Sequence, residues 1–237
     1  MQATPPSGQP SCSRSRGSVA RGESLPDRLV PEEKAGLVPA GLLREGEIVV
    51  GVELIAPEPL SRGAQVAPER AAACLSLSAD DVRTDAHAPQ VISVDLSFLV
   101  LKLASRGALC RAKPDRAAYD DLPPLEGAVS ACAYTRDVGS QASDAGSDLQ
   151  ARMFTPCMTE DPATGSATAA TAALLAELQG GEELGLRVGR GVDMGRSSIL
   201  LARVRKLDGA TATFVGGRCV AVMEGTFHLV GEAEATA

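Results

Sequence analysis

The sequence contains no tryptophan, and aromatic side chains make up only 3% of its 237 residues. Proteins that stack nucleic-acid bases or sugars on an aromatic platform need more of them, so both classes are disfavoured. The formal net charge of −7 and the pI near 5.0 leave no basic stripe for nucleic acid and no polybasic membrane anchor. We expect neither nucleic acid nor a membrane as a partner.

Metal-binding and secretion signals are missing as well. The six cysteines are scattered, no two form a Cys-x-x-Cys pair, and there are only two histidines. This spacing matches no zinc site, so we expect no metal. The N-terminus lacks the apolar run of a secretory signal. We therefore expect reduced thiols and a cytoplasmic location.

The most informative part of the sequence is residues 160–178, where a polar loop joins an apolar segment. Residues 167–176 carry no charge and nothing larger than leucine, and their alanine and leucine content predicts a helix. A helix that is apolar all round is buried, and this one is too short to cross a bilayer. We predict a buried central helix over residues 166–178.

The head of this helix combines several features of an anion-binding site. Thr164 or Ser166 can cap the helix, and Gly165 allows close approach of a ligand to the backbone. The unpaired N–H groups of the first turn and the helix dipole both favour a bound anion. Asp161 stands just outside this positive end. Taken alone, Asp161-Pro162 also fits an ordinary turn before a helix.

The rest of the chain reads mainly as short strands. Residues 1–32 are rich in Pro, Ser, Gly and Arg and predict a disordered leader. Residues 36–54 predict a hairpin with its turn at Glu45-Gly46-Glu47, and pairs of residues at Asp208-Gly209 and Gly216-Gly217 predict tight turns. Further strands are predicted at 91–94, 97–103, 125–134, 149–154, 184–188, 197–206, 211–215 and 219–223, with 226–230 as a further candidate strand. A helix is predicted at 66–75, and a short helix or a turn at 104–112. The fold class is α+β, with a curved sheet around the apolar helix.

Several segments match one protein family in chain order. They lie at residues 35–39, 91–100, 152–156, 191–198 and 215–218, and the most specific is Glu160-Asp161-Pro162-Ala163-Thr164-Gly165-Ser166-Ala167. Together they resemble the phenazine-biosynthesis PhzF-like proteins, relatives of diaminopimelate epimerase, over about residues 33–231.

The resemblance implies a diaminopimelate-epimerase-like fold of two similar halves, each a curved mixed sheet around a central helix, with the active site between them. The predicted helix 166–178 is then the central helix of the second half, which we assign to residues 63–232. Residues 33–62 correspond to a remnant hairpin of a truncated first half, residues 1–32 to the leader and 233–237 to a tail. The Gly-His-Pro-type turn and the glutamate that the first half supplies in the family have no counterpart here.

The resemblance also implies a function. Family chemistry is a cofactor-free and metal-free proton shift beside a carboxylate-bearing carbon, as in isomerising a dihydroxyanthranilate-type acid in a biosynthetic pathway. Asp161 corresponds to the catalytic acid or base of this half, and Gly165, Ser166 and Thr164 to the residues that bind the substrate carboxylate.

The missing glutamate leaves two other readings open. The chain is a catalytically inactive homologue or ligand-binding half that keeps the anion cradle, or the protein in its source cell is longer and carries the first half. A truncated first half also exposes apolar surface on the hairpin, so we expect a homodimer or other self-association.

Overall fold

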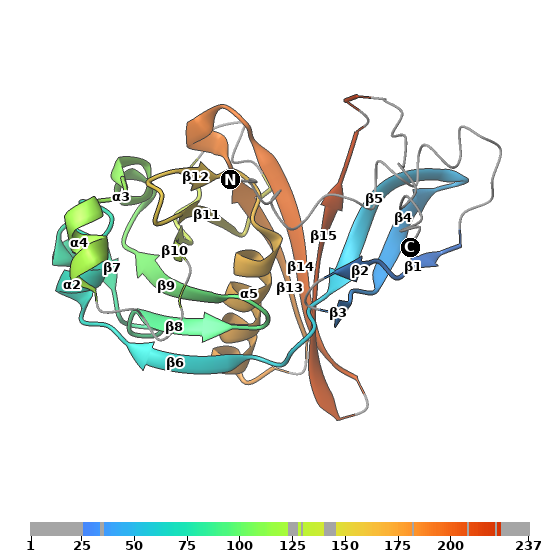
Figure 1. Cartoon of the computed structure of the whole chain (residues 1–237), viewed down its shortest axis with the longest axis horizontal. Coiled ribbons are helices and arrows are strands. Elements are labelled where there is room, and N and C mark those ends of the chain that lie inside the picture. Colours follow the sequence, from blue (N-terminus) through green and yellow to red (C-terminus); the bar gives the residue numbers. More distant parts are fainter. Residues whose placement is uncertain are drawn as a thin grey trace, which may run out of the picture.

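The main feature of the fold is a mixed sheet of 13 strands that curls around one helix (Figure 1). The structure is a computed structural model that describes residues 26–33, 36–122, 128, 130–139, 146–181, 183–207, 209–220 and 222–223. All neighbouring strands are antiparallel except for two parallel pairs, β9 (Ser97–Leu103) with β10 (Ser130–Thr135) and β11 (Leu149–Phe154) with β13 (Glu183–Arg190). The expected α+β class, with a curved sheet around an apolar helix, is confirmed.

The strands follow an order in space that differs from their order in the chain. Along the sheet they are β1 (Arg28–Leu29), β4 (Ala40–Glu45), β5 (Ile48–Ile55), β15 (Ala210–Arg218), β14 (Ser198–Leu207), β13 (Glu183–Arg190), β11 (Leu149–Phe154), β10 (Ser130–Thr135), β9 (Ser97–Leu103), β8 (Gln90–Ser93) and β6 (Ser61–Gln65). Two short strands branch off this path, β12 (Glu160–Asp161) on β11 and β7 (Val82–Arg83) on β9. A separate two-stranded sheet pairs β2 (Glu32–Glu33) with β3 (Gly36–Leu37).

Helix α5 (Gly165–Gln179) fills the inside of the curl and confirms the predicted central helix (Figure 1). Ten consecutive residues of α5, from Ala167 to Ala176, are buried. Their small side chains let strands approach the helix closely from several sides, because packed interiors leave little space between neighbouring elements. The helix ends at Gly180, whose φ of 65° is left-handed and suits glycine best.

The strands around α5 alternate in the way that a one-sided core requires. Leu184, Leu186 and Val188 of β13 all pack in the cluster around the helix. The residues between them, Gly185 and Arg187, lie on the other face of the sheet. The next position of the same alternation is Arg190. The period-two pattern therefore carries a charged residue into the same apolar interior.

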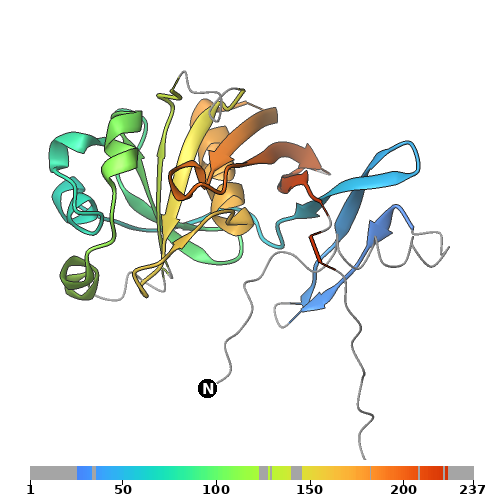
Figure 2. The same cartoon turned by 90° about the horizontal axis from the view of Figure 1, so that it is seen from above.

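A second core lies on the other face of β9, β10 and β11. Three short helices cover it: α2 (Pro68–Ala73), α3 (Arg106–Arg111) and α4 (Arg116–Asp121). Figures 1 and 2 both place these helices at the end of the molecule opposite the β4–β5 hairpin. Helices α2 and α3 lie within the segments predicted to be helical, whereas α4 and strand β6 were not predicted.

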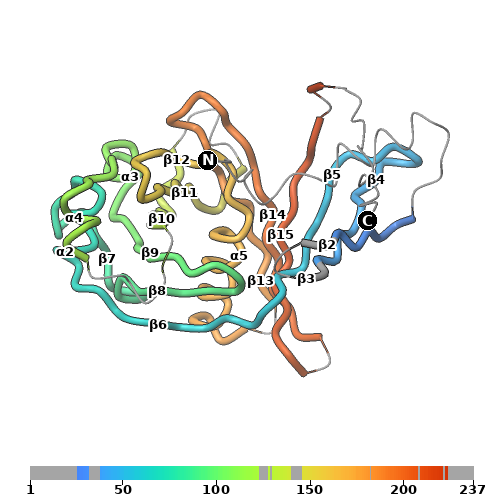
Figure 3. The backbone as a smooth tube through the Cα atoms, viewed as in Figure 1, coloured from blue at the N-terminus to red at the C-terminus, as the bar shows by residue number. Residues whose placement is uncertain are grey.

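The β4–β5 hairpin is confirmed and lies beyond β15, outside the curl (Figure 3). Its turn contains Gly46 at φ 61°. The predicted turn at Gly216-Gly217 is wrong, because both glycines lie inside β15 and pair with β5. A side chain at Gly216 would collide with the carbonyl oxygen of Val52, so the glycine serves close strand approach.

The two ends of the described chain correct further predictions. Strand β1 lies within the predicted disordered leader, which is therefore wrong at residues 28–29, because their backbone pairs with the free edge of β4. Residues 219, 220, 222 and 223 form no strand, contrary to prediction, and the side chains of Val220, Val222 and Met223 are exposed. Cys219 still donates a backbone hydrogen bond to the carbonyl oxygen of Val50 in β5 at 2.9 Å, but no later described residue of this run continues the pairing. The leader prediction is also wrong at Glu32, which pairs with Leu37 in the β2–β3 sheet. Residues 1–25 of the leader, the strand predicted at 226–230 and the tail lie outside the described residues.

The cysteines also differ from expectation at one position. Cys74, Cys110, Cys132 and Cys157 are free thiols, as expected. Cys219 is disulfide-bonded, so the prediction of reduced thiols is wrong there.

Candidate active site

The predicted site residues come together at the head of α5. Thr164 occupies the N-cap position, and Gly165 and Ser166 begin the first turn. No described group accepts a hydrogen bond from the backbone N–H groups of Gly165, Ser166 or Ala167. A Cβ atom added at Gly165 would lie at ordinary van der Waals distance from Val215 of β15. The helix therefore presents unpaired donors and the positive end of its dipole, which together favour an anion.

Asp161 lies at the end of β12 and is half-buried beside these donors. Its Oδ1 accepts a hydrogen bond from the N–H of Ala163 at 3.0 Å, which closes the turn into the helix. No other described side chain forms a hydrogen bond or an ion pair with the Asp161 carboxylate. The second carboxylate oxygen is thus available to a ligand.

Arg190, which the sequence did not single out as a site residue, reaches the same place from the end of β13. It is 0% exposed, and its Nη2 donates to Thr164 Oγ1 at 2.9 Å and to the carbonyl oxygen of Asp161 at 3.4 Å. Its Nη1 donates to Cys132 Sγ at 3.8 Å, and its Nε has no hydrogen-bond partner. Within the described part of the chain, no aspartate or glutamate pairs with it.

Thr164 does not cap its own helix, although it stands at the N-cap position. An N-cap threonine usually accepts a hydrogen bond from an N–H of the first turn. Here the hydroxyl oxygen accepts from Arg190 instead. Thr164 therefore does not cap the helix as predicted, and the N–H groups of the first turn have no acceptor among the described residues.

The loop after β13 supports the Asp161-Pro162 turn. Gly191 has φ 66°, and a side chain there would collide with the carbonyl oxygen of Arg196 and press on Pro162. The N–H of Arg196 donates to the Gly191 carbonyl oxygen at 2.9 Å and closes the loop. The side chain of Arg196, which lies in the family-like segment 191–198, forms no hydrogen bond or ion pair with a described residue.

A network of ion pairs fixes β12 from the opposite face of the sheet. Arg152 of β11 binds both carboxylate oxygens of Glu160 at 2.9 and 2.6 Å, and both side chains are 11% exposed. The remaining Nη1 of Arg152 donates to the carbonyl oxygens of Leu109, Cys110 and Ala112 at the end of α3. All three side-chain nitrogens of Arg152 thus donate hydrogen bonds, and they hold β12, together with Asp161, in place.

Asp193 extends this network to α3. Its carboxylate accepts two hydrogen bonds from Arg106 at 3.0 and 2.8 Å and lies 3.7 Å from Arg152. Burial acts to raise the pKa of Asp193, but the hydrogen bonds and charges of the two arginines outweigh it, and the pKa is lowered. Glu160 and Asp193 are thus committed to structural pairs, which leaves Asp161 as the unpaired carboxylate of this region.

A signal for Arg190 was present in the sequence. The apolar alternation of β13 at Leu184, Leu186 and Val188 continues to position 190. A charged residue on the buried face of a strand needs a polar partner or a function. The partner comes from a different segment, so the pattern alone identifies the anomaly but not what it contacts.

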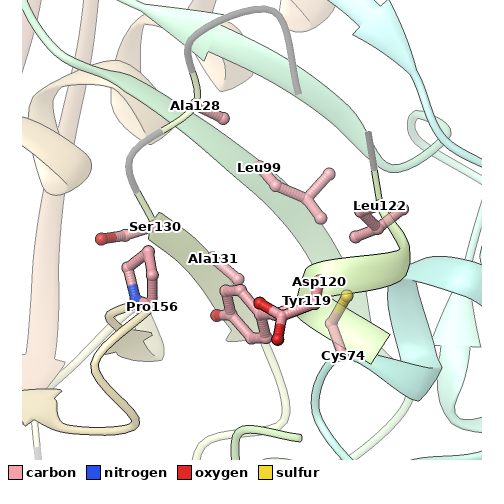
Figure 4. Close-up of a pocket in the computed structure, with 9 residues that line it drawn as sticks. All are labelled: Cys74, Leu99, Tyr119, Asp120, Leu122, Ala128, Ser130, Ala131 and Pro156. Carbon is pink, nitrogen blue, oxygen red and sulfur yellow. The ribbon is translucent and has the colours of Figure 1, made fainter. Parts of the chain in front are cut away.

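The cavity shown in Figure 4 contains none of the predicted site residues. It has a volume of about 110 Å³ and lies on the α2–α4 side of the sheet. Its lining is mostly apolar and consists of Cys74, Leu99, Tyr119, Asp120, Leu122, Ala128, Ser130, Ala131 and Pro156. Burial raises the pKa of the Cys74 thiol to about 11, so this cysteine is not a ready nucleophile.

His87, to which the sequence assigned no role, is a buried core residue. Its Nδ1 lies 2.8 Å from the Ala88 carbonyl oxygen and its Nε2 lies 2.8 Å from the Tyr134 hydroxyl. Since Nδ1–H donates to the carbonyl, Nε2 accepts from the tyrosine in the neutral ring. The described residues contain no cluster of three or more potential metal ligands, and no described helix has the length and hydropathy to span a membrane.

Comparisons with known sequences identify the family of the chain. A family model described as phenazine biosynthesis-like protein matches residues 15–225. Trans-2,3-dihydro-3-hydroxyanthranilate isomerase of Pseudomonas aeruginosa is 31% identical over 217 residues, which cover 87% of this chain and 69% of that protein. An uncharacterized isomerase of Mesorhizobium japonicum is 28% identical over 220 residues, covering 88% of this chain and 70% of that protein.

The solved structures agree at the level of the fold. The crystal structure of a PhzF-family phenazine biosynthesis protein from Bacillus anthracis aligns with a TM-score of 0.69 at 19% identity. The alignment covers 85% of this chain and 69% of that one. The expected PhzF-like, diaminopimelate-epimerase-like fold is confirmed.

Proposed function

The chain belongs to the phenazine biosynthesis-like protein family, and from this premise we propose that it is an isomerase that moves a proton on a small carboxylic acid in a biosynthetic pathway. Family membership supports isomerase or epimerase chemistry in general. The proton shift, the absence of a cofactor or metal from it, and the carboxylic acid substrate are the specific content of the proposal.

One observation carries the proposal. At the head of α5, an unpaired carboxylate lies beside unpaired backbone donors, with a buried guanidinium behind them. Thr164, Gly165 and Ser166 form the cradle for the substrate carboxylate, and Asp161 is the acid or base that exchanges a proton with the neighbouring carbon. General acid–base catalysis needs this combination of a positioned proton carrier and donors aimed at developing negative charge.

The two groups divide the work in a definite way. Holding the carboxylate fixes the carbon beside it near Asp161, so that proton transfer becomes intramolecular. As the carbon loses a proton, charge spreads toward the carboxylate, and the N–H groups of α5 stabilise it without reorganising. The Arg152–Glu160 pair keeps β12 in place while this happens.

The experiment is solvent exchange followed by proton NMR. The wild-type chain is incubated in D2O with trans-2,3-dihydro-3-hydroxyanthranilate, the acid in the name of the Pseudomonas relative, and with a panel of other small carboxylic acids. We expect deuterium to enter one carbon of at least one acid. Asp161→Asn should slow this by about a hundredfold or more, since it removes the proton carrier but keeps the shape.

Asp120→Asn is the matched control, because Asp120 is an exposed carboxylate on α4. It should exchange at the wild-type rate. Equal rates for wild type and D161N would contradict the role of Asp161.

A second candidate function is binding without turnover. It is favoured by the observation that the nearby carboxylates of Glu160 and Asp193 are held in ion pairs with Arg152 and Arg106, which leaves Asp161 without a second unpaired carboxylate in this region of the described chain. Binding of a carboxylic acid by calorimetry, with no deuterium exchange in any acid of the panel, would favour this candidate over the isomerase.

A further inference from the structure

The strongest unexplained feature of the molecule is the charge of Arg190. The side chain is completely buried, its Nε has no hydrogen-bond partner, and no described carboxylate pairs with it. Buried charges are normally paired, because removing a charge from water without a counter-ion costs several kcal/mol. A protein that keeps such a residue leaves room for a counter-ion from outside.

The position of this charge makes its cost higher still. The guanidinium lies 2.9 Å from the hydroxyl of the N-cap residue Thr164, at the positive end of the α5 dipole. Cations stabilise helices at the opposite end, and anions stabilise them at this one. Two positive features therefore lie together, and the nearby Asp161 carboxylate forms no hydrogen bond or ion pair with Arg190. A bound anion relieves both positive features at once.

Arg190 also controls the donors of the helix. By donating to Thr164 Oγ1 it holds the hydroxyl in a hydrogen bond, and the structure shows no capping bond from the first turn to that oxygen. The N–H groups of Gly165, Ser166 and Ala167 consequently stay open toward the ligand.

We infer that Arg190 is the positioning residue that charges and opens the carboxylate cradle at the head of α5, acting through Thr164 and without touching the ligand. This inference rests on the proposed carboxylate site and adds to it the residue that sets its affinity. It concerns binding, so it holds for the isomerase and for the binding-only candidate alike.

The test measures binding of anthranilate, a stable aromatic acid, by calorimetry, with aniline as the probe that lacks the carboxylate. Arg190→Met removes the charge and the donor, Arg190→Gln keeps a donor only, and Arg190→Lys keeps both. We expect R190M and R190Q to weaken anthranilate binding at least about tenfold and R190K to remain within about threefold of wild type. Aniline binding should be weak and unchanged throughout.

Arg203→Met is the matched control. This variant also removes one positive charge. In the wild type, however, Arg203 pairs with Glu53 and stacks on Phe214, away from the head of α5. It should bind anthranilate within about twofold of wild type, because long-range charge is screened.

A readout independent of affinity is the set of backbone amide NMR signals of Gly165, Ser166 and Ala167. In wild type and R190K they should shift on titration with anthranilate, and in R190M they should shift only at about tenfold higher concentration. Should R190M fail to fold, R190Q carries the same test.

The outcomes separate the inference from the proposed site. Failure of the wild type to bind anthranilate or any carboxylic acid of the panel overturns the cradle and the inference with it. Wild-type binding that survives in R190M and R190Q overturns the inference alone. Equal losses in R190M and R190K also overturn it, because packing and not charge would then be responsible.

Discussion

Arg152 and Arg190 lie on the neighbouring strands β11 and β13, but on opposite faces of the sheet and in opposite electrostatic situations. Arg152 binds both oxygens of Glu160 and three carbonyl oxygens at the end of α3. Arg190 has only neutral partners, namely a hydroxyl, a thiol and a carbonyl. The difference teaches that burial alone does not define a structural arginine. An arginine that is paired with a carboxylate stabilises the fold, whereas one left without a counter-ion carries a charge that an anion bound nearby can balance.

The most direct way to break this comparison is to neutralise one charge on each side. Glu160→Gln leaves the buried Arg152 with only the more distant carboxylate of Asp193, at 3.7 Å, as a counter-ion. We therefore expect it to lower the free energy of unfolding by about 3 kcal/mol. Arg190→Met removes a charge that has no counter-ion, and we expect no loss of stability or a small gain. Urea denaturation of both variants measures this. A loss in R190M as large as that in E160Q would make Arg190 a structural residue like Arg152.

A second prediction concerns the loop that follows Arg190 and carries Asp193, which lies 3.7 Å from Arg152. Gly191→Ala should destabilise the fold by about 2 kcal/mol more than Gly195→Ala, and it should also weaken carboxylate binding. Both glycines have positive φ, but only a side chain at 191 collides with neighbouring backbone and presses on Pro162. Thermal unfolding and calorimetry check the two effects. Equal destabilisation would show that the contact with Pro162 is not what positions the turn.

A smaller effect is expected from His87, a buried group that the fold keeps neutral. Burial lowers its pKa below the ordinary value of 6.5. The unfolded chain therefore binds this proton more readily, so stability is complete above about pH 6.5 and falls as the pH drops toward the lowered pKa of the folded state. His87→Gln, which cannot titrate, should lose this part of the pH dependence. Unfolding midpoints of both proteins between pH 5 and 8 measure the difference, and parallel curves would contradict the assignment.

The weakest expected effect is on assembly, which we propose to be self-association of the chain. Ile48 at the tip of the β4–β5 hairpin is 64% exposed, and Val222 and Met223 are each 88% exposed. Light scattering should give a mass above the 24.3 kDa of one chain, and Ile48→Lys should lower it, because a charge on exposed apolar surface opposes association. A single-chain mass for the wild type at micromolar concentration would count against the proposal.

The sequence was a good guide wherever one segment sufficed. Alanine and leucine over residues 167–176 identified the buried helix, and the Glu160–Ala167 string identified both the family and the head of α5. Asp161, Thr164, Gly165 and Ser166 come together because they are neighbours in the chain, so no folding step was needed to place them side by side. Strand β11 coincides with its prediction for a similar reason, since its alternation is strong and local.

The failures share one physical cause, which is that the missing information lies in another part of the chain. Gly216-Gly217 looks like a turn until β5 approaches its backbone, and Arg28–Leu29 look disordered until β4 offers a free edge. Residues 219–223 have the composition of a strand, but of the described residues 219, 220, 222 and 223 only Cys219 forms a backbone hydrogen bond with β5.

By itself, then, the sequence determined the family, the α+β class, the central helix and the residues at its head, because hydrophobic pattern, helix propensity and a contiguous motif are local properties. Only the tertiary structure decided which charges are paired. The spacing along the chain does not reveal that Arg152 meets Glu160, that Thr164 meets Arg190, or that no described carboxylate meets Arg190. Electrostatic energies depend on distance and burial, and these exist only after the sheet has closed around α5.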